Sequence, residues 1–548
     1  MKRIFTTAIM AFACYSLVSA QCVEVPSNRV LLVGDSWAAF QYADQTINDG
    51  LKNVGHSDKR FVSNVQIAEN GADTWDFVDG PKQDAIQDII DANASIDIVH
   101  LSIGGNDLLG DWHVSFTDQQ TDSLTNEVKI RLDSIVDFLQ NTRTGMNVFW
   151  PGYAYPNFGE IIEDMAPFQA SHPFFGTWDG MGQPDFITIN SILNEMSDSV
   201  AYSASIDPKL DFVRAQGILQ YHFGQIAPLG VAPGGTYAQF DAPLPLGYPD
   251  YPSPQDGMRL YIGIFKDCFH LSPEGYLAMF TYQAQKFYQK FLMDDLYLLS
   301  EGSTMDGSVS SAGDVSQEIL IGETGGNELA AVVSFDTPQM ADTTLAGASI
   351  FLRIEEITGA TAIVGNDLYV KMVNGNFGTS ADVEAVDYMD TPDAEGEPCR
   401  HGGNAVVGNW IRLDLTAEMI NGIHNSTKTQ FLISVPGFTG GTMKFNDASD
   451  PELAPILNLR YGASPDGIAD YMLRNELPVY PVPTSGPLTI DVEAHKLVSI
   501  EVLNILGEVV FNAAAFDNTI DISNLPNGTY ILKITTDEGV SSKRIIKR

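Results

Sequence analysis

The sequence predicts a three-layer α/β sandwich around a parallel sheet, followed by two all-β sandwich domains. In roughly the first 300 residues, short apolar runs alternate with segments of helical spacing, as strands and helices do in α/β domains. From there the chain changes to short β-type runs separated by Gly, Asp, Asn and Thr, a pattern typical of antiparallel sandwiches. About the last 70 residues form a second, more compact series of such runs.

The composition limits the possible classes of protein. The chain has 548 residues, and at roughly 150 residues per domain this length predicts three or four domains. Hydrophobic residues make up 44% and charged residues 18% of the chain, which excludes a mostly disordered protein. Acidic residues outnumber basic ones 70 to 30, for a formal net charge of −40. Such a surface repels phosphate backbones, so nucleic acid is not an expected partner.

The N-terminus has the pattern of a secretory signal peptide over residues 1–20. Lys2 and Arg3 precede an apolar stretch at residues 8–13, and small residues lead up to a predicted cleavage after Ala20. No later run approaches the 18 or so apolar residues needed to cross a bilayer, so no transmembrane segment is expected. Three cysteines remain after cleavage, which allows one disulfide at most, and Cys22 with Cys268 is a possible pair.

The predicted α/β domain covers residues 21–298. Residues 30–33 form a continuously apolar run, as expected of a strand buried on both faces of a sheet. A tight turn and a helix follow, with apolar residues at helical spacing. The same alternation predicts strands at 61–68, 96–103, 147–150 and 210–213 and helices at 82–92, 118–140 and 186–200.

Polar or glycine-bearing turns follow the first three strands, and a fourth polar block lies late in the region. The turns are Gly34-Asp35-Ser36, Asn70-Gly71 and Gly104-Gly105-Asn106-Asp107, and the late block is Asp267-Cys268-Phe269-His270. Ligands of open α/β sheets bind beyond the carboxyl ends of the strands. The four segments are therefore expected to meet at one rim of the sheet.

These four blocks, present in order, resemble those of the SGNH (GDSL-type) hydrolase superfamily. The resemblance covers roughly residues 29–295 and implies an SGNH hydrolase-like, flavodoxin-like fold. It assigns the nucleophile to Ser36, the base to His270 and the orienting acid to Asp267, which is close enough to fix the tautomer of the imidazole. The oxyanion hole would consist of the Ser36 and Gly71 backbone N–H groups and the Asn106 amide. No metal or organic cofactor is required.

Neighbouring residues have simpler interpretations. Asp35 is expected to support its turn, Asp107 to cap a helix or brace a turn, and His100 to lie in the core. Trp37 either lines the pocket or packs beneath the helix, and packing is favoured. The long segment 151–263 is rich in aromatics that could stack on sugars or grip an acyl chain. The remaining histidines of this region have no metal-ligand spacing and are expected to be structural or at the surface: His113, His172 and His222.

The predicted middle domain covers residues 299–463. Its stretches 331–335, 346–352 and 443–461 resemble the DNRLRE-type β-sandwich modules found beside polysaccharide-degrading domains. The resemblance implies a carbohydrate-binding module, and a rigid spacer is the alternative.

A linker is predicted at residues 464–475 and a small β domain at 476–548. Residues 480–486, 505–507, 525–530 and 543–547 resemble the C-terminal sorting domain of the type IX secretion system. The resemblance implies recognition by that machinery and a secreted or surface location.

Together, these features predict a secreted serine esterase that works through an acyl-enzyme. The appended sandwich favours O-acetyl groups on a polysaccharide as the substrate. A lipase or lysophospholipase is the alternative enzyme, and a surface glycan-binding protein with an inactive hydrolase domain is the alternative outside enzymes.

Overall fold

The computed structural model describes most of the chain. The described residues are 26–227, 235–337, 345–359, 368–402, 405–423, 428–461, 479–480, 482, 484–490, 497–504, 509–514, 519–536 and 539–548. The predicted signal peptide, Cys22 and the predicted linker lie outside these ranges.

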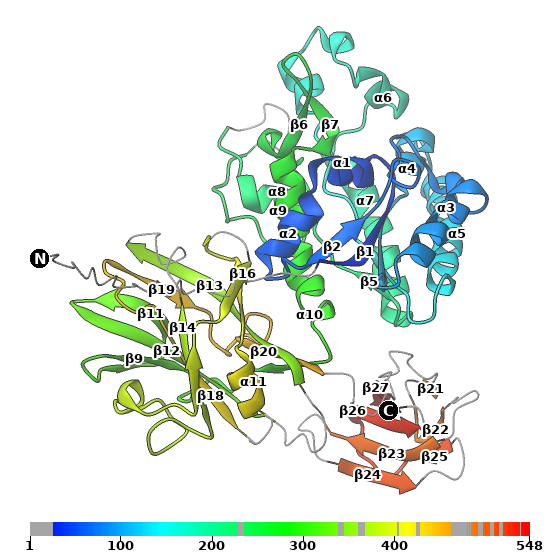
Figure 1. Cartoon of the computed structure of the whole chain (residues 1–548). Helices are drawn as coiled ribbons and strands as arrows, with labels where there is room; N and C mark the ends of the chain where they lie inside the picture. Colours follow the sequence, from blue (N-terminus) through cyan, green and yellow to red (C-terminus); the bar gives the residue numbers. More distant parts are fainter. Residues whose placement is uncertain are drawn as a thin grey trace, which may run out of the picture.

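A five-stranded parallel sheet forms the centre of the α/β domain (Figure 1). The strand order β2-β1-β3-β4-β5 is the flavodoxin-like doubly wound order, in which the chain direction across the sheet reverses between β1 and β3. This arrangement confirms the predicted fold class. The strands are β1 (Ser27–Gly34), β2 (Lys59–Val62), β3 (Ile98–Ser102), β4 (Asn147–Trp150) and β5 (Leu210–Phe212).

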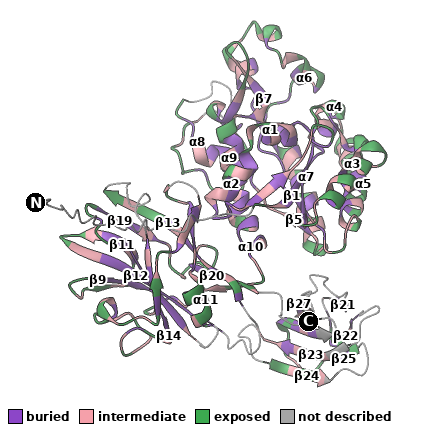
Figure 2. Ribbon diagram, in the orientation of Figure 1, coloured by how far each residue is buried: buried purple, intermediate pink, exposed green. Residues whose placement is uncertain are grey.

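Helices cover both faces of this sheet and complete the three layers. Leu31 and Val33 belong to the hydrophobic cluster on one face, whereas Val30 and Leu32 belong to the cluster on the other, as the alternation of side chains in a strand requires. The first cluster is covered by α3 (Pro81–Ala92), α5 (Asp118–Asn141) and α7 (Phe186–Ile206), and the second by α2 (Thr46–Asn53) and α9 (Pro273–Gln283). Figure 2 shows buried residues in the central strands and exposed ones on the outer sides of α3 and α5. The shorter helices are α1 (Ser36–Asp44), α4 (Gly105–Asp111), α6 (Phe175–Gly180), α8 (Ile218–Phe223) and α10 (Gln289–Phe291).

Two segments differ from the sequence-based expectation. The predicted strand at 61–68 ends at Val62 because Asn64 begins a turn, its side chain accepting hydrogen bonds from the backbone of Gln66 and Ile67. A two-stranded hairpin, β6 (Met258–Ile262) and β7 (Phe265–Leu271), was not anticipated. The outer half of β6 is exposed at successive positions, so the hairpin lacks the alternation that identifies a half-buried strand.

The middle region is an antiparallel β-sandwich, as predicted. The long strand β13 (Leu345–Gly359) joins its two sheets, since its first part pairs with β17 and β20 and its last part with β19. The apolar core lies between the sheets. The other elements are β8 (Leu296–Leu299), β9 (Gly307–Ser310), β10 (Val315–Ser316), β11 (Ile319–Thr324), β12 (Asn327–Phe335), β14 (Tyr369–Asn374), β15 (Ala394–Gly396), β16 (Cys399–Gly402), β17 (Trp410–Asp414), α11 (Ala417–Ile423), β18 (Thr429–Ser434), β19 (Gly441–Phe445) and β20 (Ile456–Tyr461).

The α/β domain and the β-sandwich share a buried core. Phe351, Trp410 and Ile456 of the sandwich belong to the same hydrophobic cluster as Leu51 of α2 and Phe280 of α9. Polar contacts surround this core and join three further pairs: Asn409 to Asn53 at 3.2 Å, Arg412 to Asp58 at 2.5 Å, and Gln285 to the Gly408 carbonyl at 2.8 Å.

This shared core lies at the amino ends of the parallel strands. Asn53 ends α2, and Asp58 immediately precedes β2. Because α2 runs back along the sheet from its carboxyl edge, the sandwich sits at the end opposite to the turns that follow β1 and β3 (Figure 1).

The C-terminal region forms small antiparallel sheets with one apolar core, in agreement with the second predicted all-β domain. Among the residues described, no helix combines the length and apolar character needed to span a bilayer. The strands are β21 (Val479–Tyr480), β22 (Pro487–Ile490), β23 (Leu497–Leu503), β24 (Val509–Ala514), β25 (Thr519–Asp521), β26 (Gly528–Thr536) and β27 (Gly539–Lys547).

The cysteines do not pair as suggested from the sequence. Cys268 is a free, buried thiol, and Cys399 is disulfide-bonded. The possible pair of Cys22 with Cys268 is therefore wrong. Burial raises the pKa of the Cys268 thiol well above its usual range, so this group is an uncharged core residue.

Candidate active site

Ser36 lies at the carboxyl edge of the sheet, at the point where β1 passes into α1. Gly34 makes this turn possible, because a Cβ at that position would lie only 1.8 Å from the Ser102 carbonyl oxygen of β3. Asp35 is the N-cap of α1, and its carboxylate accepts a 2.9 Å hydrogen bond from the Trp37 backbone N–H. Ser36 is the first residue of the helix, so its own N–H is one of those left without an intrahelical partner.

Asp35 is held from a second side by Tyr153. The Tyr153 hydroxyl donates a 2.6 Å hydrogen bond to the Asp35 carboxylate and accepts a 3.1 Å hydrogen bond from the Gly105 N–H. Burial raises the pKa of Asp35 to about 6, although its hydrogen bonds from Tyr153 and Trp37 act in the opposite direction. Tyr153 therefore links the turn that carries Ser36 to the turn that begins α4.

His270 and Asp267 both lie on β7, the strand of the unanticipated hairpin. The Nε2 atom of His270 is 2.7 Å from the Ser36 Oγ, and its Nδ1 atom is 2.7 Å from the Asp267 carboxylate. The Asp267 side chain is buried, and its other oxygen accepts hydrogen bonds from the Phe269 and His270 backbone N–H groups at 2.8 and 2.9 Å. The structure thus brings Ser36, His270 and Asp267 into one hydrogen-bonded chain, with the carboxylate fixed by its own strand.

The other two predicted site residues lie next to each other across the rim. The Asn106 side-chain amide donates a 2.8 Å hydrogen bond to the Ala72 carbonyl, which holds the Asn70-Gly71 turn against α4. An amide has two N–H groups, so a second donor of Asn106 remains for a ligand. Gly71 has a φ of +81°, and the space where its Cβ would point is open.

Asp107, the residue after Asn106, is a brace. It is buried and accepts hydrogen bonds from the backbone N–H and the hydroxyl of Thr74, at 3.0 and 2.5 Å. The Arg131 guanidinium of α5 forms an ion pair with the Asp107 carboxylate at 3.0 Å. These contacts hold the segment after Gly71 against α4. They also direct the Asp107 carboxylate toward Thr74 and Arg131 rather than toward Ser36.

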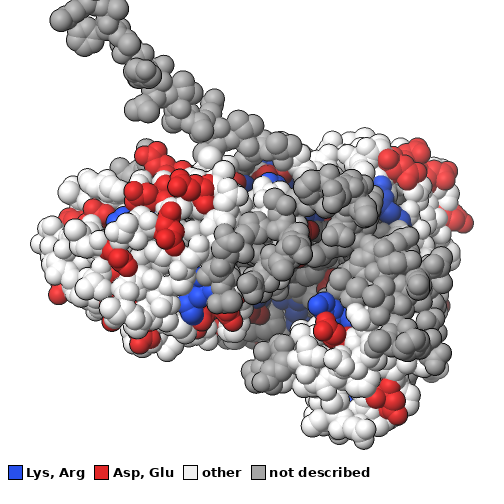
Figure 3. All heavy atoms as spheres, turned by 60° about the horizontal axis from the view of Figure 1, so that its bottom comes forward, with Lys and Arg blue, Asp and Glu red and all other residues white. Residues whose placement is uncertain are grey.

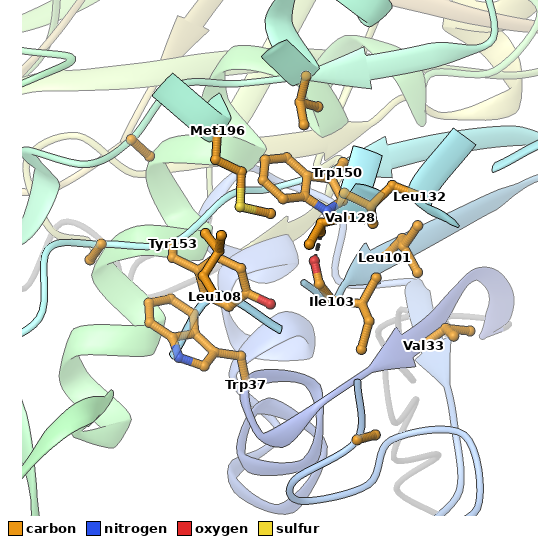
Figure 4. Close-up of a cluster of buried hydrophobic side chains, with 14 of the residues drawn as sticks. Val33, Trp37, Leu101, Ile103, Leu108, Val128, Leu132, Trp150, Tyr153 and Met196 are labelled. Carbon is orange, nitrogen blue, oxygen red and sulfur yellow. Dashed lines mark hydrogen bonds between the residues drawn. The ribbon is translucent and has the colours of Figure 1, made fainter. Parts of the chain in front are cut away.

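A pocket with apolar walls opens beside Ser36, His270 and Asn106. Trp37 both lines this pocket and packs against the core, in edge contact with Tyr153 at 5.0 Å and with Tyr276 at 5.3 Å. Figure 4 shows Trp37, Leu108 and Tyr153 side by side within the hydrophobic cluster. The apolar part of the wall comes from α4, α7, β7 and the connecting segments: Leu108, Leu109, Trp112, Met181, Ile189, Ile192, Leu193 and Phe269.

The remaining histidines lie apart from this chain of hydrogen bonds. His100 is buried in β3 and contacts the Tyr288 hydroxyl at 3.0 Å, and burial lowers its pKa to about 3. His172 is paired with Glu160 at 3.0 Å. Over the described residues, no group of three His, Cys, Asp or Glu side chains is arranged to hold a metal ion.

Sequence reasoning missed two parts of the site. Tyr153 lies in the aromatic-rich segment 151–263, and nothing in the sequence distinguishes it as the residue that contacts Asp35, 118 positions away. The apolar wall from α7 was predicted only as a helix at residues 186–200. The spacing of Ile189, Ile192, Leu193 and Met196 signals an apolar face, but this spacing looks the same whether the face packs on a core or borders a pocket.

Comparisons with known proteins give one match at the C-terminus and several weak structural similarities. Residues 478–548 match the family model of a secretion system C-terminal sorting domain. This confirms the sorting domain predicted from the sequence and, with it, the predicted secreted or surface location. No curated protein matches the chain.

Three solved structures illustrate these structural similarities. A carbohydrate acetylesterase from Sinorhizobium meliloti is 13% identical, with 48% of this chain and 100% of that chain covered and a TM-score of 0.27. An aryl esterase from M. smegmatis is 12% identical, with 48% and 99% covered and a TM-score of 0.28. A GDSL-like lipase from Bacteroides thetaiotaomicron is 15% identical, with 48% and 89% covered and a TM-score of 0.26. At such values the likeness says nothing about substrate, which has to be judged from the pocket itself.

Proposed function

We propose that this protein is a secreted hydrolase of carboxylic esters that works through an acyl-enzyme on Ser36. The observation that carries the proposal is the hydrogen-bonded chain from Ser36 through His270 to Asp267 at the mouth of an apolar pocket. A serine hydroxyl is a weak nucleophile until a base accepts its proton, and the His270 imidazole nitrogen at 2.7 Å is placed to act as that base.

The proposed reaction has two halves. His270 Nε2 accepts the Ser36 hydroxyl proton as Oγ attacks the ester carbonyl carbon, and then donates that proton to the departing alcohol oxygen. Water next attacks the acyl-enzyme, with His270 again accepting and returning a proton, so that the carboxylic acid leaves and Ser36 is restored. Asp267 accepts from Nδ1–H, which keeps Nε2 unprotonated and facing Ser36.

Three donors are proposed for the oxyanion that forms in each half. They are the backbone N–H groups of Ser36 and Gly71 and the side-chain amide of Asn106. The free N–H of Ser36 at the start of α1 and the hydrogen bond that holds Asn106 beside the Gly71 turn support this assignment. Loss of one such donor typically costs about 2.7–4 kcal/mol of transition-state stabilisation.

The pocket favours esters with an apolar acyl group longer than acetyl. Its walls beyond Ser36 are formed by Leu108, Ile192, Leu193 and other apolar side chains, which an acetyl group alone would leave largely uncovered. A lipase- or arylesterase-like substrate therefore fits better than the acetylated polysaccharide preferred from the sequence. The β-sandwich adds little support for a polysaccharide, because it packs at the end of the sheet away from Ser36.

Labelling with a fluorophosphonate tests the reaction class. Wild-type protein is expected to be captured covalently at Ser36, and Ser36→Ala is expected to give no capture and to lower kcat by on the order of 10⁶-fold. An inactive, glycan-binding protein would show no capture alongside firm glycan binding.

A substrate panel tests the acyl preference. It consists of p-nitrophenyl acetate, butyrate, octanoate and palmitate, together with acetylated xylan. A preference for butyrate or octanoate supports the apolar pocket as the acyl site, whereas release of acetate from xylan in preference to all other substrates would support the polysaccharide esterase.

A further inference from the structure

The β6–β7 hairpin carries an exposed apolar patch that the proposed reaction does not use. Leu260, Tyr261, Ile262 and Ile264 are 59%, 57%, 60% and 83% exposed, and these four residues are named here the hairpin patch. They occupy four of five consecutive positions. A contiguous apolar surface of this kind, in contrast to scattered single residues, marks an interaction site.

The turn at the tip of the hairpin leaves the patch exposed to solvent. Gly263, with a φ of +62°, starts the two-residue loop that joins the strands, and nothing lies within 4 Å of the position of its Cβ. Such loops usually carry polar residues beside the glycine, but here the neighbour is Ile264, the most exposed residue of the patch. In Figure 1 the hairpin points away from the β-sandwich, so neither side of its tip is covered by that domain.

A line of aromatic contacts connects the hairpin patch to the candidate active site. Tyr261 packs against Phe174 with ring centroids 4.9 Å apart, and Phe174 packs against Phe269 at 5.8 Å. Phe269 lines the pocket next to His270. The patch is therefore continuous with the apolar wall of the pocket, and its strand β7 also bears Asp267 and His270.

The charge distribution indicates what kind of surface the patch fits. Residues 257–266 contain no Asp or Glu, although 70 of the 548 residues are acidic. Figure 3 shows separate groups of acidic side chains on the face that it draws. The net charge of −40 opposes both an anionic membrane and a second copy of the chain. Three of the four patch residues are aliphatic and have no ring face for stacking on a sugar, which leaves a neutral amphiphile surface as the fitting partner.

We propose that the hairpin patch docks on a neutral or zwitterionic lipid surface and so places the apolar pocket at the layer from which ester substrates are drawn. The contacts from Tyr261 through Phe174 to Phe269 provide an apolar path along which an acyl chain leaves that layer without crossing water. This inference rests on the proposed ester hydrolysis for its purpose, but the docking itself requires no catalysis.

Binding to vesicles tests the docking separately from the reaction. Full-length Ser36→Ala protein is mixed with phosphatidylcholine vesicles, and the bound fraction is measured by flotation. The double variant Ile262→Asp/Ile264→Asp in the same background is expected to bind at least tenfold more weakly. Ile206→Asp is the matched control, since Ile206 is 68% exposed but lies at the far end of α7, about 20 Å along the helix from Leu193.

Activity measurements complete the test. With Ser36 intact, the double variant is expected to hydrolyse soluble p-nitrophenyl butyrate within twofold of wild type. It is expected to hydrolyse long-chain esters embedded in phosphatidylcholine vesicles at least fivefold more slowly. The milder variant Ile264→Ser is expected to show the same selective loss of activity on long-chain esters. Because it introduces no charge, it tests whether the loss in the double variant is due to misfolding.

Several outcomes would overturn the docking. Equal flotation of the hairpin variant and the wild type would do so, as would the absence of any flotation. A wild-type dimer that the double variant dissociates would identify a second copy as the partner instead. If vesicles bind through the patch but fluorophosphonate captures nothing, the proposed function fails while the docking stands.

Discussion

The Tyr153 hydroxyl donates a 2.6 Å hydrogen bond to Asp35, the residue that immediately precedes Ser36. The same hydroxyl accepts from the Gly105 N–H, one residue before Asn106. One phenol therefore sets the distance between the turn that carries the candidate nucleophile and the turn that carries a candidate oxyanion donor.

Removal of this hydroxyl in Tyr153→Phe is expected to lower kcat by about ten- to one-hundred-fold with little change in KM. The ring that packs on Trp37 remains, but a hydrogen bond to a carboxylate is lost, which is worth about 1.5–3 kcal/mol. The Tyr153 hydrogen bond lowers the pKa of Asp35, so its loss should raise that pKa. If the turn needs the Asp35 carboxylate ionised, the activity of the variant should begin to fall at a higher pH than that of the wild type as the solution is made more acidic. Tyr155→Phe, which removes a hydroxyl bonded to Asn194, is the matched control, and an equal effect of both changes would refute a positioning role.

Asp35→Asn is expected to change the pH dependence of stability. The folded-state pKa of Asp35 is about 6, above the ordinary value of 3.8, so the folded protein binds this proton more tightly than the unfolded chain does. Below pH 4, Asp35 is protonated in both states and does not reduce the stability of the wild type. Above pH 6 the buried carboxylate is ionised, which lowers the free energy of unfolding by roughly 3 kcal/mol. The Tm of Asp35→Asn relative to wild type should therefore rise between pH 4 and pH 7. A difference in Tm that stays constant with pH would contradict the assignment.

Asp267→Asn is expected to lower kcat by on the order of 10⁴-fold, because an amide cannot hold His270 in the tautomer that accepts the Ser36 proton. Capture of Ser36 by fluorophosphonate should become slower but remain measurable, which separates this variant from Ser36→Ala. Near wild-type kcat in Asp267→Asn would show that the 2.7 Å contact to His270 has no role in the reaction.

Leu193→Trp is expected to narrow the acyl end of the pocket. Leu193 lines the pocket and is only partly buried, so the larger ring can project into the space that a chain would occupy. The kcat/KM for octanoate esters should fall at least tenfold, while that for acetate esters stays within threefold. A parallel loss for both esters would mean that the chain does not enter between α4 and α7.

Trp410→Ala is expected to destabilise the α/β domain although it changes the β-sandwich. Trp410 is buried in the core shared with α2 and α9, and loss of a buried Trp typically costs about 3–5 kcal/mol. The midpoint of thermal inactivation of the proposed esterase activity should drop with the unfolding midpoint. Phe335→Ala, a change inside the sandwich core, is the comparison variant. Unchanged inactivation in Trp410→Ala would mean that the two domains unfold independently.

The parts of the site that sequence alone predicted are those determined by local chemistry. Gly34, Asp35 and Ser36 form one turn between a buried strand and a helix, and Asn106 belongs to a second such turn. Their proximity follows from the rule that parallel strands end at one edge of the sheet. The strand order in the structure agrees with that expectation.

The parts that sequence did not predict depend on contacts between distant segments. Tyr153 meets Asp35 because the segment after β4 lies against Trp37 at the start of α1, and no periodicity encodes this contact. The β6–β7 hairpin lacks an alternating pattern because its tip is exposed on successive positions. The sequence around Trp410 predicts only a strand of the β-sandwich, and the role of Trp410 in the shared core depends on the packing of the sandwich against α2.

The core shared by the two domains fixes the direction in which the candidate active site faces. With the β-sandwich packed at the amino ends of the strands, Ser36 lies on the opposite side of the molecule. If the sandwich adheres to a cell envelope or a particle, the pocket faces the medium, and a substrate reaches Ser36 from the medium rather than from that support.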